Sequence, residues 1–198
     1  MPLREMKSSQ SVKTKKALIV GERVFLRAPG KNDFEELLAL SRASLRLHRG
    51  LAYPPRNTEE FATFLERCRE PNCVCCFVCR VADGAILGSM NLSQIYRGGF
   101  QGAYLGYYVG APFAGQGYMT EAIQLILRYA FEHLKLHRLE ANIQPGNLAS
   151  LALVKRAGFV REGYSRRYLR IGRRWRDHER WAIIAEDWKG DPARQRLR

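Results

Sequence analysis

One stretch in the middle of the chain, residues 105–130, constrains the fold more than any other. It begins with an apolar run, Leu105 to Val109, that is typical of a buried strand. A turn rich in glycine and proline follows, and apolar residues then recur at helical spacing from Glu121 to Ala130. Glycine lets a backbone approach a ligand, and the first N–H groups of a helix have no partner inside it. This order therefore predicts either an anion site or an ordinary strand-to-helix turn.

Length and composition predict one globular domain. The 198 residues are 46% hydrophobic and 11% aromatic, which is enough for a buried core. No apolar run is long enough to cross a membrane, and no signal-peptide core is present, so we expect a cytoplasmic protein without a membrane partner. We expect the domain to span residues 18–188, between a flexible basic tail at 1–17 and a basic C-terminal tail at 189–198.

The formal net charge of +14 suggests a polyanionic neighbour, such as RNA, a ribosome or a phosphorylated cofactor. A merely basic protein is the alternative. Much of the excess comes from arginines near the C-terminus: Arg161, Arg166, Arg167, Arg170, Arg173, Arg174, Arg176 and Arg180. One face of the strands that carry them could contact ribosomal RNA or a cofactor phosphate. The same charges could instead keep a solvated sheet edge from aggregating.

The cysteines favour neither disulfides nor a metal site. There are five of them, an odd number, at Cys68, Cys73, Cys75, Cys76 and Cys79. No histidine lies in this segment, and three of the thiols occupy alternating positions of a predicted strand. We therefore expect reduced, small apolar side chains and no bound metal.

Turn and cap residues predict the order β, αα, βββ, α, β, α, ββ. Asp83-Gly84 is typical of a hairpin, and Asn147 is placed to cap a helix that stops at Gly158. The passage from strand to helix to strand between Val109 and Ile143 favours a parallel pair inside an otherwise antiparallel sheet. We therefore predict an α/β (α+β) fold, with a mixed, mostly antiparallel sheet of about seven strands and helices on both faces.

Two motifs make the chain resemble the GCN5-related N-acetyltransferase (GNAT) superfamily. The first, Arg/Gln-x-x-Gly-x-Gly/Ala between a strand and a helix, stands here as Ala114 to Met119 and keeps only its middle glycine, Gly117. The second, Asn-x-x-Ser before a helix that ends Gly-Phe, stands as Asn147 to Ser150 with Gly158-Phe159. The Trp-Arg-Asp-His run at 175–178 is similar to the RimJ-type branch, the ribosomal-protein-alanine N-acetyltransferases. The resemblance covers residues 18–188.

The resemblance implies a GNAT fold that uses acetyl-CoA as co-substrate, with the parallel pair at the acetyl-CoA site and no metal. Ala114 and Met119 depart from the motif, so the loop is expected to hold the pyrophosphate mainly with backbone N–H groups. The implied cofactor-binding residues are Val109, Gly110, Ala114, Gly115, Gln116, Gly117, Tyr118, Met119, Thr120, Asn147, Ser150 and Arg156.

The same resemblance implies roles in acetyl transfer. The Val109 N–H is expected to hold the thioester carbonyl, and Ser150 to protonate the leaving thiolate. Each could instead be an ordinary strand donor or a helix-start hydroxyl. Tyr108 stands where family members commonly have a glutamate that acts as general base. Asp177 is a further candidate for the base, although it could equally pair with an arginine. At pH 7 roughly a tenth of α-amino groups are neutral, against under a thousandth of lysines, so an N-terminal acceptor needs only a weak or water-relayed base.

Three functions remain open on the sequence. The first is acetylation of a protein N-terminus of the ribosomal-protein-alanine type. The second is acetylation of a small amine, such as an aminoglycoside, a polyamine or an amino acid. The third is a ribosome- or RNA-binding module with a vestigial CoA site. We expect the acceptor pocket to come from residues 45–55 and the last hairpin.

Overall fold

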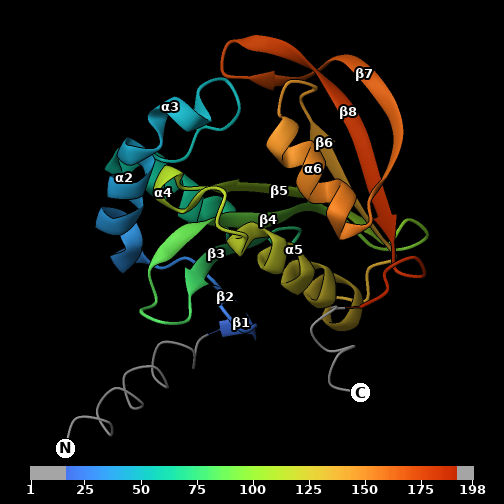
Figure 1. Cartoon of the computed structure of the whole chain (residues 1–198), viewed down its shortest axis with the longest axis horizontal. Coiled ribbons are helices and arrows are strands. Elements are labelled where there is room, and N and C mark those ends of the chain that lie inside the picture. Colours follow the sequence, from blue (N-terminus) through green and yellow to red (C-terminus); the bar gives the residue numbers. More distant parts are fainter. Residues whose placement is uncertain (1–16, 191–198) are drawn as a thin grey trace, which may run out of the picture.

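The computed structural model describes residues 17–190, so nearly all of the two predicted tails lies outside the described residues. One eight-stranded sheet runs through the domain in the order β1-β2-β3-β4-β5-β6-β8-β7 (Figure 1). Its strands are β1 (Ala17–Val20), β2 (Val24–Arg27), β3 (Val74–Arg80), β4 (Ile86–Tyr96), β5 (Gly102–Val109), β6 (Arg138–Ile143), β7 (Val160–Ile171) and β8 (Arg174–Ile184). The helical elements are η1 (Lys31–Asp33), α2 (Phe34–Ala43), α3 (Leu45–His48), α4 (Thr58–Arg67), η2 (Ala111–Phe113), α5 (Tyr118–Arg128), η3 (Tyr129–His133) and α6 (Leu148–Ala157).

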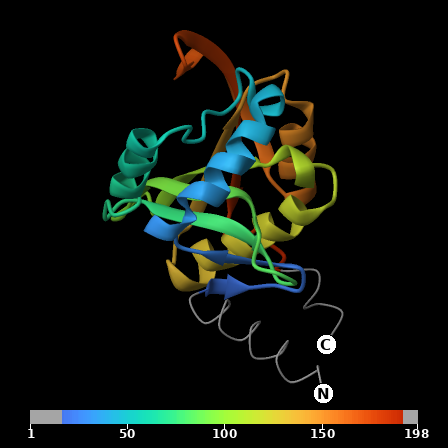
Figure 2. The same ribbon diagram turned by 90° about the vertical axis from the view of Figure 1, so that its left-hand side faces the viewer.

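Helices cover both faces of the sheet, as predicted. One apolar cluster joins α2 and α4 to one face of β2, β3 and β4, with Phe25, Phe64 and Phe77 at its centre. A larger cluster joins α5 and α6 to the opposite face, with Ile123, Leu127 and their neighbours fully buried. Figure 2 shows the sheet between these two layers. The predicted mixed α/β architecture is therefore confirmed.

The described residues contain one strand more than the seven or so predicted. Strand β1, with the sequence Ala-Leu-Ile-Val, pairs antiparallel with β2 at the point where the sequence predicts only the start of the domain. The turn between the two strands is held from far along the chain. The Glu121 carboxylate of α5 accepts the backbone N–H groups of Glu22 at 2.6 Å and Arg23 at 2.9 Å. These contacts join residues 99 and 98 positions apart, so no neighbouring residue indicates them.

Cap residues fix several helix ends, and those at Asn147 and Gly158 lie where the sequence predicted them. Asn57 begins α4, where its Oδ1 accepts the N–H of Glu60 at 2.8 Å. Asn147 begins α6 in the same way, and Gly158 ends that helix with φ +95°. The segment 45–55, which we expected to contribute to the acceptor pocket, begins with the single turn α3, and the chain then runs without regular structure to Asn57.

The predicted parallel pair is present, but it is short. Strands β5 and β6 pair only from Gly102–Arg138 to Tyr104–Glu140. Beyond Tyr104, β5 keeps its antiparallel partner β4 as far as Val109 and separates from β6. A wedge therefore opens in the sheet, and the first turns of α5 and α6 lie beside it (Figure 1).

Candidate active site

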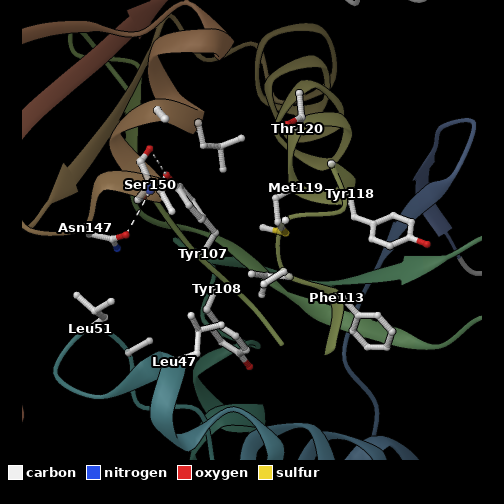
Figure 3. Close-up of a pocket in the computed structure, with 18 of the residues that line it drawn as sticks. Leu47, Leu51, Tyr107, Tyr108, Phe113, Tyr118, Met119, Thr120, Asn147 and Ser150 are labelled. Carbon is white, nitrogen blue, oxygen red and sulfur yellow. Dashed lines mark hydrogen bonds between the residues drawn. The ribbon is translucent and has the colours of Figure 1, made fainter. Parts of the chain in front are cut away.

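A cavity of about 410 Å³ occupies this wedge. The end of β5, the glycine loop with the start of α5, the start of α6, and α3 with the residues after it form its walls (Figure 3). Its lining residues are Leu47, His48, Leu51, Ala52, Tyr107, Tyr108, Val109, Phe113, Ala114, Gly115, Gly117, Tyr118, Met119, Thr120, Asn147, Ala149, Ser150, Ala152, Leu153 and Arg156. Residues from four separate segments thus converge on one space.

The glycine loop has the backbone that an anion site needs. Gly115 and Gly117 have φ values of +75° and +80°, in the left-handed region that side chains other than glycine rarely adopt. Gly117 precedes α5, and its carbonyl accepts the N–H groups of Thr120 and Glu121. The N–H groups of Tyr118 and Met119 precede those bonds, so the helix leaves them without an internal acceptor. The loop therefore directs backbone donors and the positive end of a helix dipole at the cavity.

Val109 directs its backbone away from β4. Donors in an antiparallel ladder alternate sides, and Gly110 donates its N–H to Leu87 of the β4 side at 2.7 Å. The N–H and C=O of the residue before it, Val109, therefore face the wedge. The Val109 carbonyl accepts a hydrogen bond from His48 Nε2 at 2.8 Å. The Val109 N–H is thus not a ladder donor, and it is free to bind a ligand at this point of the cavity.

Two hydroxyl groups meet on the opposite wall. Tyr107 Oη lies 2.5 Å from Ser150 Oγ, and either atom can be the donor (Figure 3). Ser150 is fixed in turn because its N–H donates to Asn147 Oδ1 at 3.2 Å. Burial raises the pKa of Tyr107 to about 12, although the Ser150 hydrogen bond acts in the opposite direction. The phenol therefore stays protonated at neutral pH, and the pair holds a hydroxyl hydrogen at this wall of the cavity.

Tyr108 lies on the other face of β5, because neighbouring side chains of a strand point in opposite directions. Its ring meets the edge of the His48 ring with centroids 5.2 Å apart, and burial raises the pKa of its hydroxyl. His48 is only 5% exposed. Because a carbonyl can only accept, Nε2 must carry the proton that binds Val109, and the other ring nitrogen is buried without a partner among the described residues. His48 thus anchors the strand end and offers no reachable base.

Most of the predicted cofactor-binding residues come together here. Those that line the cavity are Val109, Ala114, Gly115, Gly117, Tyr118, Met119, Thr120, Asn147, Ser150 and Arg156. Gly110 and Gln116 do not line it. The Gly110 N–H donates to the Leu87 carbonyl and is therefore not available to a ligand. The Gln116 side chain donates to the Pro112 carbonyl at 2.8 Å and stabilises the loop.

Asp177 is not brought to the cavity. Its carboxylate accepts the Tyr164 hydroxyl at 2.6 Å and the Arg167 N–H at 2.7 Å, and these two bonds lower its pKa. Arg167 has φ +49° and sits where the β7–β8 register shifts between Ser165 and Leu169. The side chain therefore stabilises a bulge in the hairpin, and the geometry does not support the catalytic role that we predicted for it.

The sequence interpretation missed several lining residues, of which Tyr107 and His48 matter most. Strand alternation could have found Tyr107, because residues 107 and 109 share a face of β5 while Tyr108 does not. His48 had no comparable signal, since its contact with Val109 spans 61 positions of the chain. It lay, however, within the segment that we expected to line a pocket.

The described residues contain no cluster of three or more histidine, cysteine or acidic side chains arranged to hold a metal. None of the five cysteines forms a disulfide. Burial raises the pKa of the Cys73 and Cys79 thiols to about 12. Within residues 17–190, helices that combine the length and the apolar character of a membrane span are absent.

Comparison with known proteins identifies the family. A family model described as an acetyltransferase (GNAT) domain matches residues 23–160. The [ribosomal protein uS5]-alanine N-acetyltransferase of Escherichia coli (strain K12) is 42% identical over 103 residues, which are 52% of this chain and 53% of that one. The aligned stretch thus spans little more than half the length of the curated relatives that the chain matches.

Solved structures match over most of the chain. The structure of Mycobacterium smegmatis RimJ in complex with CoA-disulfide superposes with a TM-score of 0.78 at 25% identity, covering 88% of each chain. The spermidine N-acetyltransferase of Vibrio cholerae, in complex with CoA and spermine, has a TM-score of 0.72 at 20% identity and covers 84% of this chain and 98% of that one. At that identity the second similarity concerns the fold alone.

Proposed function

The chain belongs to the GNAT acetyltransferase family, and from this premise we propose that it transfers an acetyl group from acetyl-CoA to the N-terminal α-amino group of a protein. One observation carries the proposal. Among the described residues, the cavity joins backbone donors, a Tyr107–Ser150 hydroxyl pair and the Val109 N–H, and its lining contains no Asp or Glu.

The residues present fit acetyl-CoA as co-substrate. Two left-handed glycines and the unpaired first N–H groups of α5 suit a pyrophosphate, which needs donors and no nearby carboxylate. Arg156 is the one arginine of the lining and adds a positive charge on α6. The departures at Ala114 and Met119 remove side-chain contacts and leave this backbone arrangement intact.

The chain's own groups then account for the transfer step. The Val109 N–H stabilises the charge that develops on the thioester oxygen, a contribution of about 3 kcal/mol for one well-placed donor. The acceptor nitrogen forms a bond to the carbonyl carbon while the carbon–sulfur bond breaks. The amine proton passes to water, and the Tyr107–Ser150 pair supplies a proton to the leaving sulfur.

The missing carboxylates also bear on the acceptor. A polyamine is charged at neutral pH and is bound best by acidic side chains, whereas an α-amino group is partly neutral and needs no strong base. The 42% identity to a ribosomal-protein-alanine acetyltransferase supports the same choice. We therefore propose a ribosomal protein as acceptor, met in the cytoplasm, and place a small-molecule amine second.

Incubation with acetyl-CoA tests this choice. The acceptors are peptides that begin with Ala, Ser or Met, the same peptides with a formylated N-terminus, and spermidine, and mass spectrometry reads the products at several pH values between about 7 and 9. We expect acetylation of free N-termini alone. Acetylation of spermidine or of internal lysines, with no N-terminal product at any pH, would contradict the proposal.

A further inference from the structure

The tip of the β7–β8 hairpin exposes a tryptophan among arginines. Trp175 is 61% exposed, and its partner directly across the ladder is Arg170. Arg174 pairs with Ile171 at the next position, and Arg173 lies in the turn. Figure 1 shows this hairpin arching away from the rest of the sheet, above α3. A large ring is therefore presented to solvent directly across from Arg170, with Arg173 and Arg174 next to it in the sequence at the turn.

The positive charge at this tip has no carboxylate partner among residues 17–190. Farther from the tip, Arg161 of β7 pairs with Glu179 of β8 at 3.1 Å, and Glu162 of β7 pairs with Arg138 of β6. The carboxylate nearer the tip, Asp177, is occupied by the Tyr164 hydroxyl and the Arg167 N–H. No ion pair joins Arg170, Arg173 or Arg174 to a described acidic residue, so their charges are available to an outside partner.

The tip is held against a second aromatic residue. Gly172 has φ +62°, which favours glycine. A Cβ atom there would also lie only 2.7 Å from the hydroxyl of Tyr53, so glycine lets the turn lie close to this ring. Tyr53 is 55% exposed, and the Arg56 guanidinium lies 5.5 Å from its ring centroid. Tyr53 directly follows Ala52, which lines the active cavity. The contact joins two arginine–aromatic groups into one surface at the acceptor side.

We propose that this surface, which we call the hairpin rim (Tyr53, Arg56, Arg170, Arg173, Arg174 and Trp175), binds single-stranded RNA. Exposed rings stack on unpaired bases, and guanidinium groups bind the phosphates between them. An acidic peptide would satisfy the arginines and leave the indole exposed, so the alternation of rings and charges favours RNA. This binding goes beyond the acetyl transfer proposed above and does not depend on it.

Fluorescence anisotropy of the full chain with a labelled short oligouridylate, measured over a range of salt concentrations, tests the proposal. In a plot of log affinity against log salt concentration, the triple variant R170Q/R173Q/R174Q should reduce the magnitude of the slope by about 2, at roughly 0.7 per lost phosphate contact. Trp175→Ala should weaken binding about tenfold and leave that slope unchanged. The matched control K31Q/R42Q/R69Q removes the same charge from exposed positions near α2 and α4 and should leave the slope unchanged.

Each other outcome overturns the proposal. An equal change of slope in the control variant would mean that net charge alone binds RNA, and an unchanged affinity for Trp175→Ala would remove the stacking contact. Competition by a polyglutamate peptide as effective as that by unlabelled RNA would assign the rim to an acidic protein. Circular dichroism and CoA binding of each variant verify folding. The peptide acetylation assay reports separately on the proposed enzyme activity.

Discussion

The hydroxyl pair in the cavity yields the sharpest prediction, because it separates chemistry from packing. Tyr107→Phe removes one oxygen and keeps the ring that packs against the core. The hydrogen bond to Ser150, at 2.5 Å, is worth about 1 kcal/mol to the free energy of unfolding. If the pair is the general acid, kcat/KM should fall about a hundred- to ten-thousand-fold, or about 3 to 5 kcal/mol in activation free energy. The loss of activity thus far exceeds the loss of stability.

Steady-state release of the CoA thiol measures kcat/KM, and urea unfolding measures stability in parallel. Because Tyr107 and Ser150 are predicted to act as one unit, Ser150→Ala and the double variant should lose about as much activity as Tyr107→Phe. Tyr129→Phe is the matched control, since it makes the same change at a partly buried residue of the same core cluster that does not line the cavity, and it should alter kcat/KM little. A Tyr107→Phe enzyme within about threefold of wild type, against the loss expected of a general acid, would refute the assignment.

Three further predictions concern the backbone around the site and the outer sheet. Gly117→Ala places a side chain at φ +80° and should cost about 1–2 kcal/mol of unfolding free energy and weaken CoA binding, whereas Gly99→Ala, in open space, should do neither. His48→Leu leaves the strand carbonyl that it binds without a donor and should lower both kcat and stability, while His48→Gln should retain most of each. Arg138 lowers the pKa of Glu162, so their ion pair stabilises the fold above about pH 4.5, and this contribution is lost as pH falls through the lower pKa of the folded state. The urea midpoint of Arg138→Gln should therefore fall less between neutral and acid pH than that of the wild type.

Features set by neighbouring residues were predictable from the sequence. The cap at Asn147 and the stop at Gly158 depend on residues a few positions apart, and the structure has them where expected. The parallel β5–β6 pair followed from a strand–helix–strand order, which allows few topologies. The resemblance to GNAT motifs then placed the glycine loop and Ser150 in one cavity.

Features set by distant contacts were not predictable. The turn after β1 is bound by Glu121 from far along the chain, and His48 reaches Val109 only because α3 folds across the end of β5. Asp177 appeared reactive by residue type, but Tyr164 and the bulge at Arg167 determine what it binds. No pattern of spacing reports such partners.

The early separation of β5 from β6 has a consequence for association between molecules. Strand β5 is central in the sheet, yet beyond Tyr104 no strand pairs with its β6 side, where His48 binds the Val109 carbonyl. Exposed edges of this kind invite pairing with other chains and aggregation. Here the edge lies inside a cavity walled by α3 and α6, where only a slender backbone or ligand can reach it. The unpaired side of β5 is thus accessible to ligands in the cavity, while α3 and α6 prevent a strand of another molecule from pairing with it.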